Sequence, residues 1–357
     1  MDPQISAGLL AFAGALVGAL VAIYTQRRKR NEELADHIAG RLEMQQARKQ
    51  QALERRRDVF RLYADPLFAA VTSLKWRLHE VLEQPGRAIY LLAEAPSTPY
   101  HEYKFCSTLF RLAAVLGWIR AYRRQRAQLD PREKQELDLA EVSIEKFESA
   151  LADGPHVEDQ RLDELTKLLV KGTQPELDEK EHRRLSVLLE NLWRARIARL
   201  GVLSPTELGQ EQQDALLNDI RLLLERELKV EVPAPLVESL RIEACLVMGI
   251  REAYLYRDWQ AAIGDIMIVP FDSPGGRKFD VSGFRDFERL YKQATANESH
   301  DDRSWIFRLE ALFTDLDIEK MGMFDARRDQ LRKTYEALLE LESHLRDKIV
   351  ALESSDT

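Results

Sequence analysis

Charge is missing from one part of this chain. Residues 5–24 carry no formal charge, although 31% of the 357 residues are charged. Twenty helical residues span about 30 Å, which is the thickness of the hydrocarbon core of a bilayer. The stretch therefore predicts a single transmembrane helix. A cleaved secretory signal would need a basic region before the stretch, and only Asp2 and the amino terminus precede it.

Cysteine is scarce as well, and positive charge is outnumbered by negative charge. Cys106 and Cys245 are the only cysteines. Both lie in apolar helical patterns, which excludes a disulfide framework and indicates buried thiols in a reducing compartment. The net charge of -8 argues against a general nucleic-acid-binding protein, because neutralising phosphates takes a concentrated excess of Lys and Arg. We therefore expect no nucleic-acid partner.

Recognisable catalytic motifs are also absent. The sequence has no nucleophile elbow, phosphate-binding glycine loop, dinucleotide fingerprint or HExxH motif. We therefore predict that the protein is not an enzyme and has no catalytic residue, cofactor or bound metal.

Positive charge is concentrated just after the apolar stretch, at Arg27, Arg28, Lys29 and Arg30. Lys and Arg beside a membrane segment stay in the cytoplasm. The sequence therefore predicts a single-pass protein of the inner or plasma membrane, with a short N-terminus outside and a cytoplasmic C-terminal domain.

Gly14 and Gly18 form a GxxxG pair within a strip of small residues in the predicted span. Such strips let two helix backbones approach closely in lipid, which predicts self-association as an oligomer. The alternative is that glycine and alanine are simply common in membrane helices, and the pattern does not decide between the two. The expected partners are therefore the bilayer, a second copy and an unidentified protein.

From residue 27 to residue 64 the chain has no proline and only one glycine, Gly40. Strong helix formers dominate, which predicts a basic helical stalk. Two glutamines interrupt its apolar seam, which disfavours a stable coiled coil. Asp65-Pro66 is predicted to end the stalk, because proline suits the first turn of a new helix.

Beyond the stalk, apolar residues recur every three or four positions, which predicts helices. Residues 236–263 are predicted to form one long core helix. A short hairpin is predicted at residues 266–269 and 278–281, around a Ser-Pro-Gly-Gly turn. The fold class is therefore all-α, a cytoplasmic multi-helix bundle with at most one hairpin. The predicted segments are an anchor at 1–26, a stalk at 27–64, a helical domain in two halves at 65–154 and 236–352, a helical insertion at 155–235 and a tail at 353–357.

Several short motifs occur in two distant parts of the chain. They are Tyr63-Ala64-Asp65-Pro66-Leu67, Leu74, Arg77-Leu78, Ser107-Thr108-Leu109, Leu116-Gly117-Trp118-Ile119, Trp259, Ala262-Ile263-Gly264-Asp265-Ile266-Met267 and Phe284-Arg285-Asp286-Phe287. With these motifs the chain resembles a family of uncharacterised helical proteins known from bacteria and fungi. The resemblance covers residues near 60–130 and 250–350 and implies one helical domain made from two halves that are distant in sequence.

Three groups of residues are candidates for chemistry. Arg30-Asn31 with His37 resembles the signature of HEPN-type ribonucleases, although the spacer is longer than usual; the alternative is a solvated stalk. Two acidic clusters with histidine lack the spacing that directs metal ligands to one point, and acidic residues are expected at helix starts in any case. They are Glu179, Glu181 and His182, and Glu298, His300, Asp301 and Asp302.

A pocket, if the domain has one, is expected near Asp258, Trp259 and Asp265. The alternative for Asp265 is that it is a surface residue at the C-terminal end of a helix and does not belong to a pocket. We predict a membrane-anchored scaffold or interaction protein. The alternatives are a self-associating membrane effector, for example in phage defence, and a HEPN-like ribonuclease.

Overall fold

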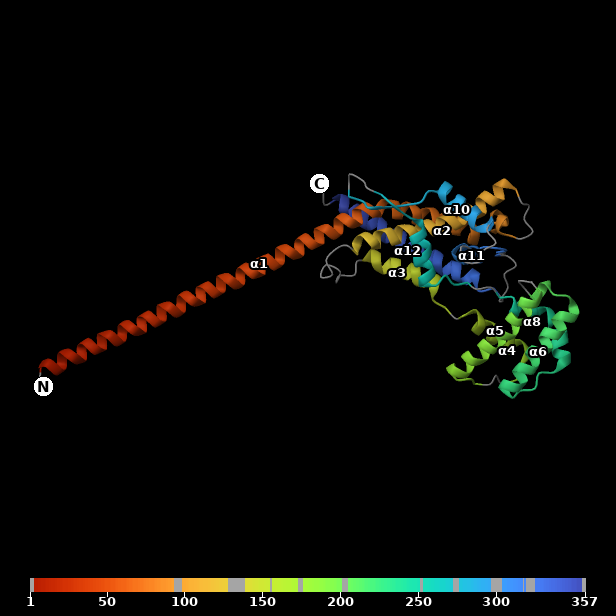
Figure 1. Cartoon of the computed structure of the whole chain (residues 1–357), viewed down its shortest axis with the longest axis horizontal. Coiled ribbons are helices and arrows are strands. Elements are labelled where there is room, and N and C mark those ends of the chain that lie inside the picture. Colours follow the sequence, from red (N-terminus) through yellow and green to blue (C-terminus); the bar gives the residue numbers. More distant parts are fainter. Residues whose placement is uncertain are drawn as a thin grey trace. The chain divides into compact units, whose positions relative to one another are not determined.

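The computed structural model is helical throughout the part of the chain that it describes, apart from one short pair of strands (Figure 1). That part is residues 3–354 without residues 93–97, 128–138, 155, 173–175, 201–204, 251–252, 272–275, 297–303, 317 and 319–324. It also excludes the side chains of residues 3–25 and of several other helix residues, most of them between 27 and 56. For the described residues, the predicted all-α fold with one hairpin is confirmed.

The first helix, α1 (Pro3–Glu83), passes through Pro66 without ending. The helix break predicted at this proline is therefore wrong. A proline inside a helix removes one backbone hydrogen bond and costs about 3 kcal/mol relative to alanine. Phe60 and Tyr63 before the proline and Leu67 after it are all buried. Packing on both sides therefore outweighs the local preference of proline.

The chain divides into two units, and α1 up to Val59 belongs to the first. Between Gln26 and Asp58 the described residues are exposed, except Gly40, which is half-buried. Among the residues whose side chains are described, no helix is long and apolar enough to cross a membrane. The predicted span at residues 5–24 lies in α1 but outside those side chains. The predicted anchor, stalk and domain boundaries therefore stay predictions.

The second unit begins at Phe60. The rest of α1 joins α2 (Pro99–Arg126) and α12 (Arg327–Ser354) through side-chain hydrogen bonds. The α12 helix also packs against α3 (Leu139–Ala152), and α2 against α9 (Arg257–Met267). This unit also contains α10 (Phe284–Ala296), α11 (Ser304–Ala311), η1 (Pro85–Arg87) and η2 (Ile89–Leu91).

Two glycines allow α2 and α9 to approach closely. A Cβ atom on Gly117 would lie 2.8 Å from the Cβ atom of Met267. A Cβ atom on Gly264 would lie 2.9 Å from the backbone oxygen of Leu116, which cannot move aside without shifting the helix. Both glycines are therefore required by the distance between the two helices.

The predicted hairpin is present: β1 (Ile268–Pro270) and β2 (Phe279–Val281) pair antiparallel, with Val269 opposite Asp280. Two buried side chains hold it. The amide of Gln125 donates to the Gly276 carbonyl oxygen at 2.9 Å and accepts from the Lys278 amide at 3.0 Å. The Tyr63 hydroxyl donates to the same glutamine at 2.5 Å. The hairpin is thus fixed by side chains of α1 and α2.

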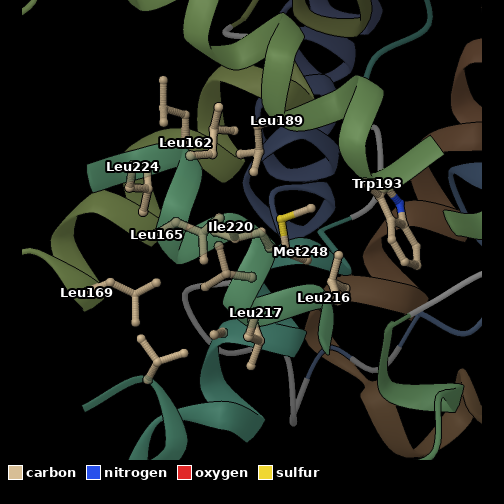
Figure 2. Close-up of a cluster of buried hydrophobic side chains, with 14 of the residues drawn as sticks. Leu162, Leu165, Leu169, Leu189, Trp193, Leu216, Leu217, Ile220, Leu224 and Met248 are labelled. Carbon is tan, nitrogen blue, oxygen red and sulfur yellow. The ribbon is translucent and has the colours of Figure 1, made fainter. Parts of the chain in front are cut away.

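A second hydrophobic core lies among α4 to α8. Figure 2 shows leucines of α4, α5 and α6 gathered with Met248, and Leu165, Leu216 and Ile220 are fully buried. The core continues to Ile250. The helices are α4 (Val157–Leu169), α5 (Glu179–Leu200), α6 (Gln210–Leu228), α7 (Ala234–Ser239) and α8 (Arg241–Met248), with η4 (Pro205–Glu207) before α6.

The single helix predicted at residues 236–263 is wrong. The chain forms α7, α8 and α9 instead, with breaks at Leu240 and after Gly249. The apolar spacing continues across the breaks because all three helices bury one side. The α7 and α8 helices contribute to the second core, whereas α9 packs against α2.

Candidate functional site

The residues predicted to act at the membrane all lie in α1. Gly14 and Gly18 fall outside the described side chains. Of the four consecutive basic residues, Arg28 and Lys29 are exposed, and the other two also fall outside. The predictions of self-association and topology therefore stay predictions.

The residues that resemble a ribonuclease signature lie in the same helix. His37 is exposed, whereas the side chains of Arg30 and Asn31 are outside the described part. In an α-helix the seven-residue spacing corresponds to a rise of about 10 Å between Arg30 and His37. The ribonuclease reading stays a prediction.

His182 belongs to a polar contact between α4 and α5. Its Nε2 lies 2.7 Å from a carboxylate oxygen of Asp163, and its Nδ1 lies 3.8 Å from Asp159. Arg183 pairs with Asp159 at 2.8 Å. Within the described residues, no three His, Cys, Asp or Glu side chains are arranged to hold a metal ion. The acidic cluster at residues 298–302 lies outside them.

Of the expected pocket residues, Asp265 near the end of α9 forms ion pairs instead. Asp265 accepts hydrogen bonds from Arg120 at 2.5 and 3.0 Å and pairs with Arg124 at 2.9 Å. Hydrogen bonds from Arg120 lower the pKa of Asp265 below its ordinary value. Asp258 is exposed and Trp259 is half-buried. The aspartate thus joins α9 to α2 where the two helices cross.

A serine and a histidine also meet between α3 and α12. The Oγ of Ser143 lies 2.5 Å from the Nδ1 of His344, a distance that a nucleophile and its base would show. Ser143 is fully buried, however. No substrate can reach this hydroxyl in the folded helix pair, so we assign the contact to packing.

The described residues do form a cavity elsewhere, between η2, the first turns of α2 and α10. Its volume is about 500 Å³, within the range of ligand sites. Edge-to-face and tilted aromatic pairs hold α10 against α2. The ring centroids of Tyr103 and Phe284 are 5.3 Å apart, and those of Phe110 and Phe287 are 5.6 Å apart.

The start of α2 places polar groups at this cavity. Thr98 is the N-cap residue and accepts a hydrogen bond from the backbone amide of His101 at 3.2 Å, and Pro99 opens the helix. His101 and Glu102 in the first turn line the cavity. A recognisable helix-start signal therefore positions one wall.

A hydrogen-bonded network adjoins the cavity at Tyr90. The Tyr90 hydroxyl accepts from Arg77 at 2.8 Å and lies 3.2 Å from the Thr108 hydroxyl. Glu80 pairs with Arg77 at 3.1 Å and with Lys104 at 2.6 Å. Because Tyr90 is buried and bonded on this side, its ring forms a fixed wall.

Two further groups on the cavity have raised pKa values. Burial raises the pKa of the Cys106 thiol to about 12, and the carboxylate of Glu288 adds to the effect. Burial and the neighbouring Glu310 raise the pKa of Tyr291, whose hydroxyl donates to Glu310 at 2.7 Å. Both groups are therefore protonated at neutral pH. This makes them ligand contacts rather than nucleophiles or bases.

The sequence-based candidates do not include the described residues that line this cavity. Its described walls come from residues 90–92, 99–106 and 288–292, which are far apart in the chain, and no short motif joins them. The usable signals were the Thr98-Pro99 helix start and the Phe284–Phe287 motif, which resembles the helical family. Neither signal predicts a hollow between the two segments.

Comparison with models of known protein families, with curated proteins and with solved structures gave no match.

Proposed function

We propose that this protein is a membrane-tethered helical interaction protein with its folded domain in the cytoplasm. The observation that supports this most is the continuity of α1. One helix contains the uncharged residues 5–24 and also the buried residues Phe60, Tyr63 and Leu67. The sequence thus links an anchor to the first core element without a loop. The proposal assigns no catalytic step.

Two observations are in line with a cytoplasmic domain. Arg28 and Lys29 are exposed just after the apolar residues, and such cations stay on the cytoplasmic side. Cys106 and Cys245 are both free and buried, which suits a reducing compartment.

The topology can be tested with reporters fused after Thr357. A reporter that works only in the cytoplasm should be active there, and a reporter that requires export should be inactive. Activity of the exported reporter would overturn the proposed orientation. Loss of membrane association after deletion of residues 1–26 should accompany the first result, because the proposal gives the protein no other anchor.

Self-association is the second part of the proposal. Replacing Gly14 and Gly18 together by leucine should weaken association in a membrane reporter assay, because larger side chains keep the backbones apart. The matched control replaces Leu16 and Leu20 by isoleucine, on another side of the same helix. Equal association of both variants would remove the small-residue strip from the proposal.

A membrane effector is the second candidate, and the same continuity of α1 favours it. A change in the folded domain at Phe60 would act directly on the helix that carries the span. Exchanging residues 5–24 for an unrelated single span separates the two functions. A tether should keep its function after the exchange. An effector would act by depolarising the membrane through its own span, so the exchange should abolish the depolarisation, which a membrane-potential dye measures.

A further inference from the structure

Several aromatic rings contribute to the lining of the cavity between α2 and α10. Tyr90, Tyr103, Phe105 and Tyr291 line it, and the buried Tyr90 is held by the hydrogen-bonded network of Arg77. Aromatic rings carry negative charge on their faces and attract cations. A wall of several rings is a typical surface for recognising substituted ammonium groups.

The ionisable side chains on the cavity are mostly acidic. Glu102 and Glu288 line it together with Lys292 and His101. Lys292 pairs with Glu288 at 2.9 Å, but 69% of the lysine side chain is exposed, against 34% of the glutamate. Glu310 adds a third carboxylate just behind Tyr291. The surroundings are therefore net negative, which disfavours an anionic ligand.

Other cations near Tyr90 offset part of this negative charge, but they lie behind the ring and not on the cavity lining. Arg77 and Lys104 lie 5.5 and 5.3 Å from the ring of Tyr90. They share a single carboxylate, Glu80, which leaves one net positive charge beside the cavity, but neither cation lines it. They fix the tyrosine, while Glu288 remains at the cavity.

From the rings, the carboxylates and the volume together, we propose that this cavity binds a small organic cation that bears an alkylammonium group. The ammonium group would lie against Tyr103 and Tyr291 with Glu288 as its counter-ion. The alkyl part would contact Phe105 and Leu92. This inference does not depend on the membrane anchor and goes beyond the tethering proposed above.

The test measures binding by isothermal titration calorimetry on the full-length protein in detergent. The probes are choline, its uncharged carbon isostere 3,3-dimethylbutanol, spermidine and acetate. Choline or spermidine should bind, and the isostere should bind about tenfold more weakly than choline because it lacks the charge. Comparing choline with spermidine distinguishes a quaternary ammonium ligand from a polyamine.

Two variants locate the binding. Glu288→Gln should weaken binding of the cation about tenfold, and the partly exposed position should tolerate the amide. Glu340→Gln is the matched control, since that glutamate of α12 pairs with Lys146 of α3, outside the cavity lining. The thermal unfolding of both variants should match that of the unchanged protein.

Several results would overturn the inference. These are equal binding of choline and its uncharged isostere, preferential binding of acetate, an equal effect of the two glutamine variants, or no saturable binding of either amine up to about 10 mM. None of these results bears on membrane attachment. If the cavity does not bind an organic cation, the proposed membrane tether is still tested separately by the reporter and deletion experiments.

Discussion

At the scale of single residues, the crossing of α2 and α9 depends on Gly264. Gly264→Ala would place a methyl group 2.9 Å from the Leu116 backbone oxygen. The helices would have to move apart, which costs about 1–3 kcal/mol. Chemical denaturation should therefore show a lower free energy of unfolding for this variant.

Gly86→Ala is the control for that experiment. A Cβ atom on Gly86 has no neighbour within 4 Å, so this variant should unfold like the unchanged protein. An equal loss of stability in both variants would mean that the contact between the two helices does not explain the effect.

Glu342 on α12 gives a prediction about pH. Burial alone would raise its pKa, but hydrogen bonds from Lys75 and Thr72 outweigh burial and leave the pKa below its ordinary value. A carboxyl whose pKa is lower in the folded state stabilises the fold above its unfolded pKa and loses this contribution as the pH falls. The free energy of unfolding should therefore decrease from about pH 6 to about pH 3.

Glu342→Gln should reduce that slope, measured by urea denaturation at a series of pH values. The amide keeps the shape of the side chain but cannot be titrated. An unchanged slope would show that other carboxylates govern the acid sensitivity.

At the scale of helices, Pro66 is the least expected residue of α1. It lies inside the helix and lacks the amide that would bond to the carbonyl of residue 62. Pro66→Ala should therefore raise the free energy of unfolding, by about 1–3 kcal/mol. A lower stability would show that the proline ring itself is needed in the core.

The same helix indicates how far the sequence could predict the fold. Apolar spacing of three and four correctly predicted helices, and the Ser-Pro-Gly-Gly turn correctly predicted the hairpin. The helix break predicted at Pro66 was wrong because the burial of apolar residues on both sides outweighs the tendency of proline to end a helix. The prediction of a single helix at residues 236–263 was wrong for a related reason. The spacing of apolar residues indicates which residues are buried, but not whether they belong to one helix or to three.

The candidate site was less predictable than the fold. Asp265 could be recognised as polar and well placed, but its pairing with Arg120 joins segments 145 residues apart. The cavity combines Tyr90 and Tyr103 with Glu288, which come from distant segments. A cavity forms where two packed segments leave space between their side chains. No local pattern in a single sequence indicates where this happens.

At the scale of the whole molecule, the division at Val59 gives a further prediction. A protein that begins at Asp58 retains every buried residue from Phe60 onward. In the same detergent, this shorter protein and the full chain should unfold in one cooperative transition at the same urea concentration. The reason is that none of the described side chains before Asp58 is part of a hydrophobic core. A large shift in the midpoint would show that the first unit stabilises the second.

The bonds between α1 and α12 also have a consequence for synthesis of the protein. Lys75 meets Glu342 across 267 residues of sequence. At 5–20 residues per second, a ribosome takes about 15–50 s to make the intervening chain. During that time the buried apolar residues of α1, from Phe60 to Leu82, lack their last partner. Newly made chains should therefore depend on chaperones until α12 leaves the ribosome.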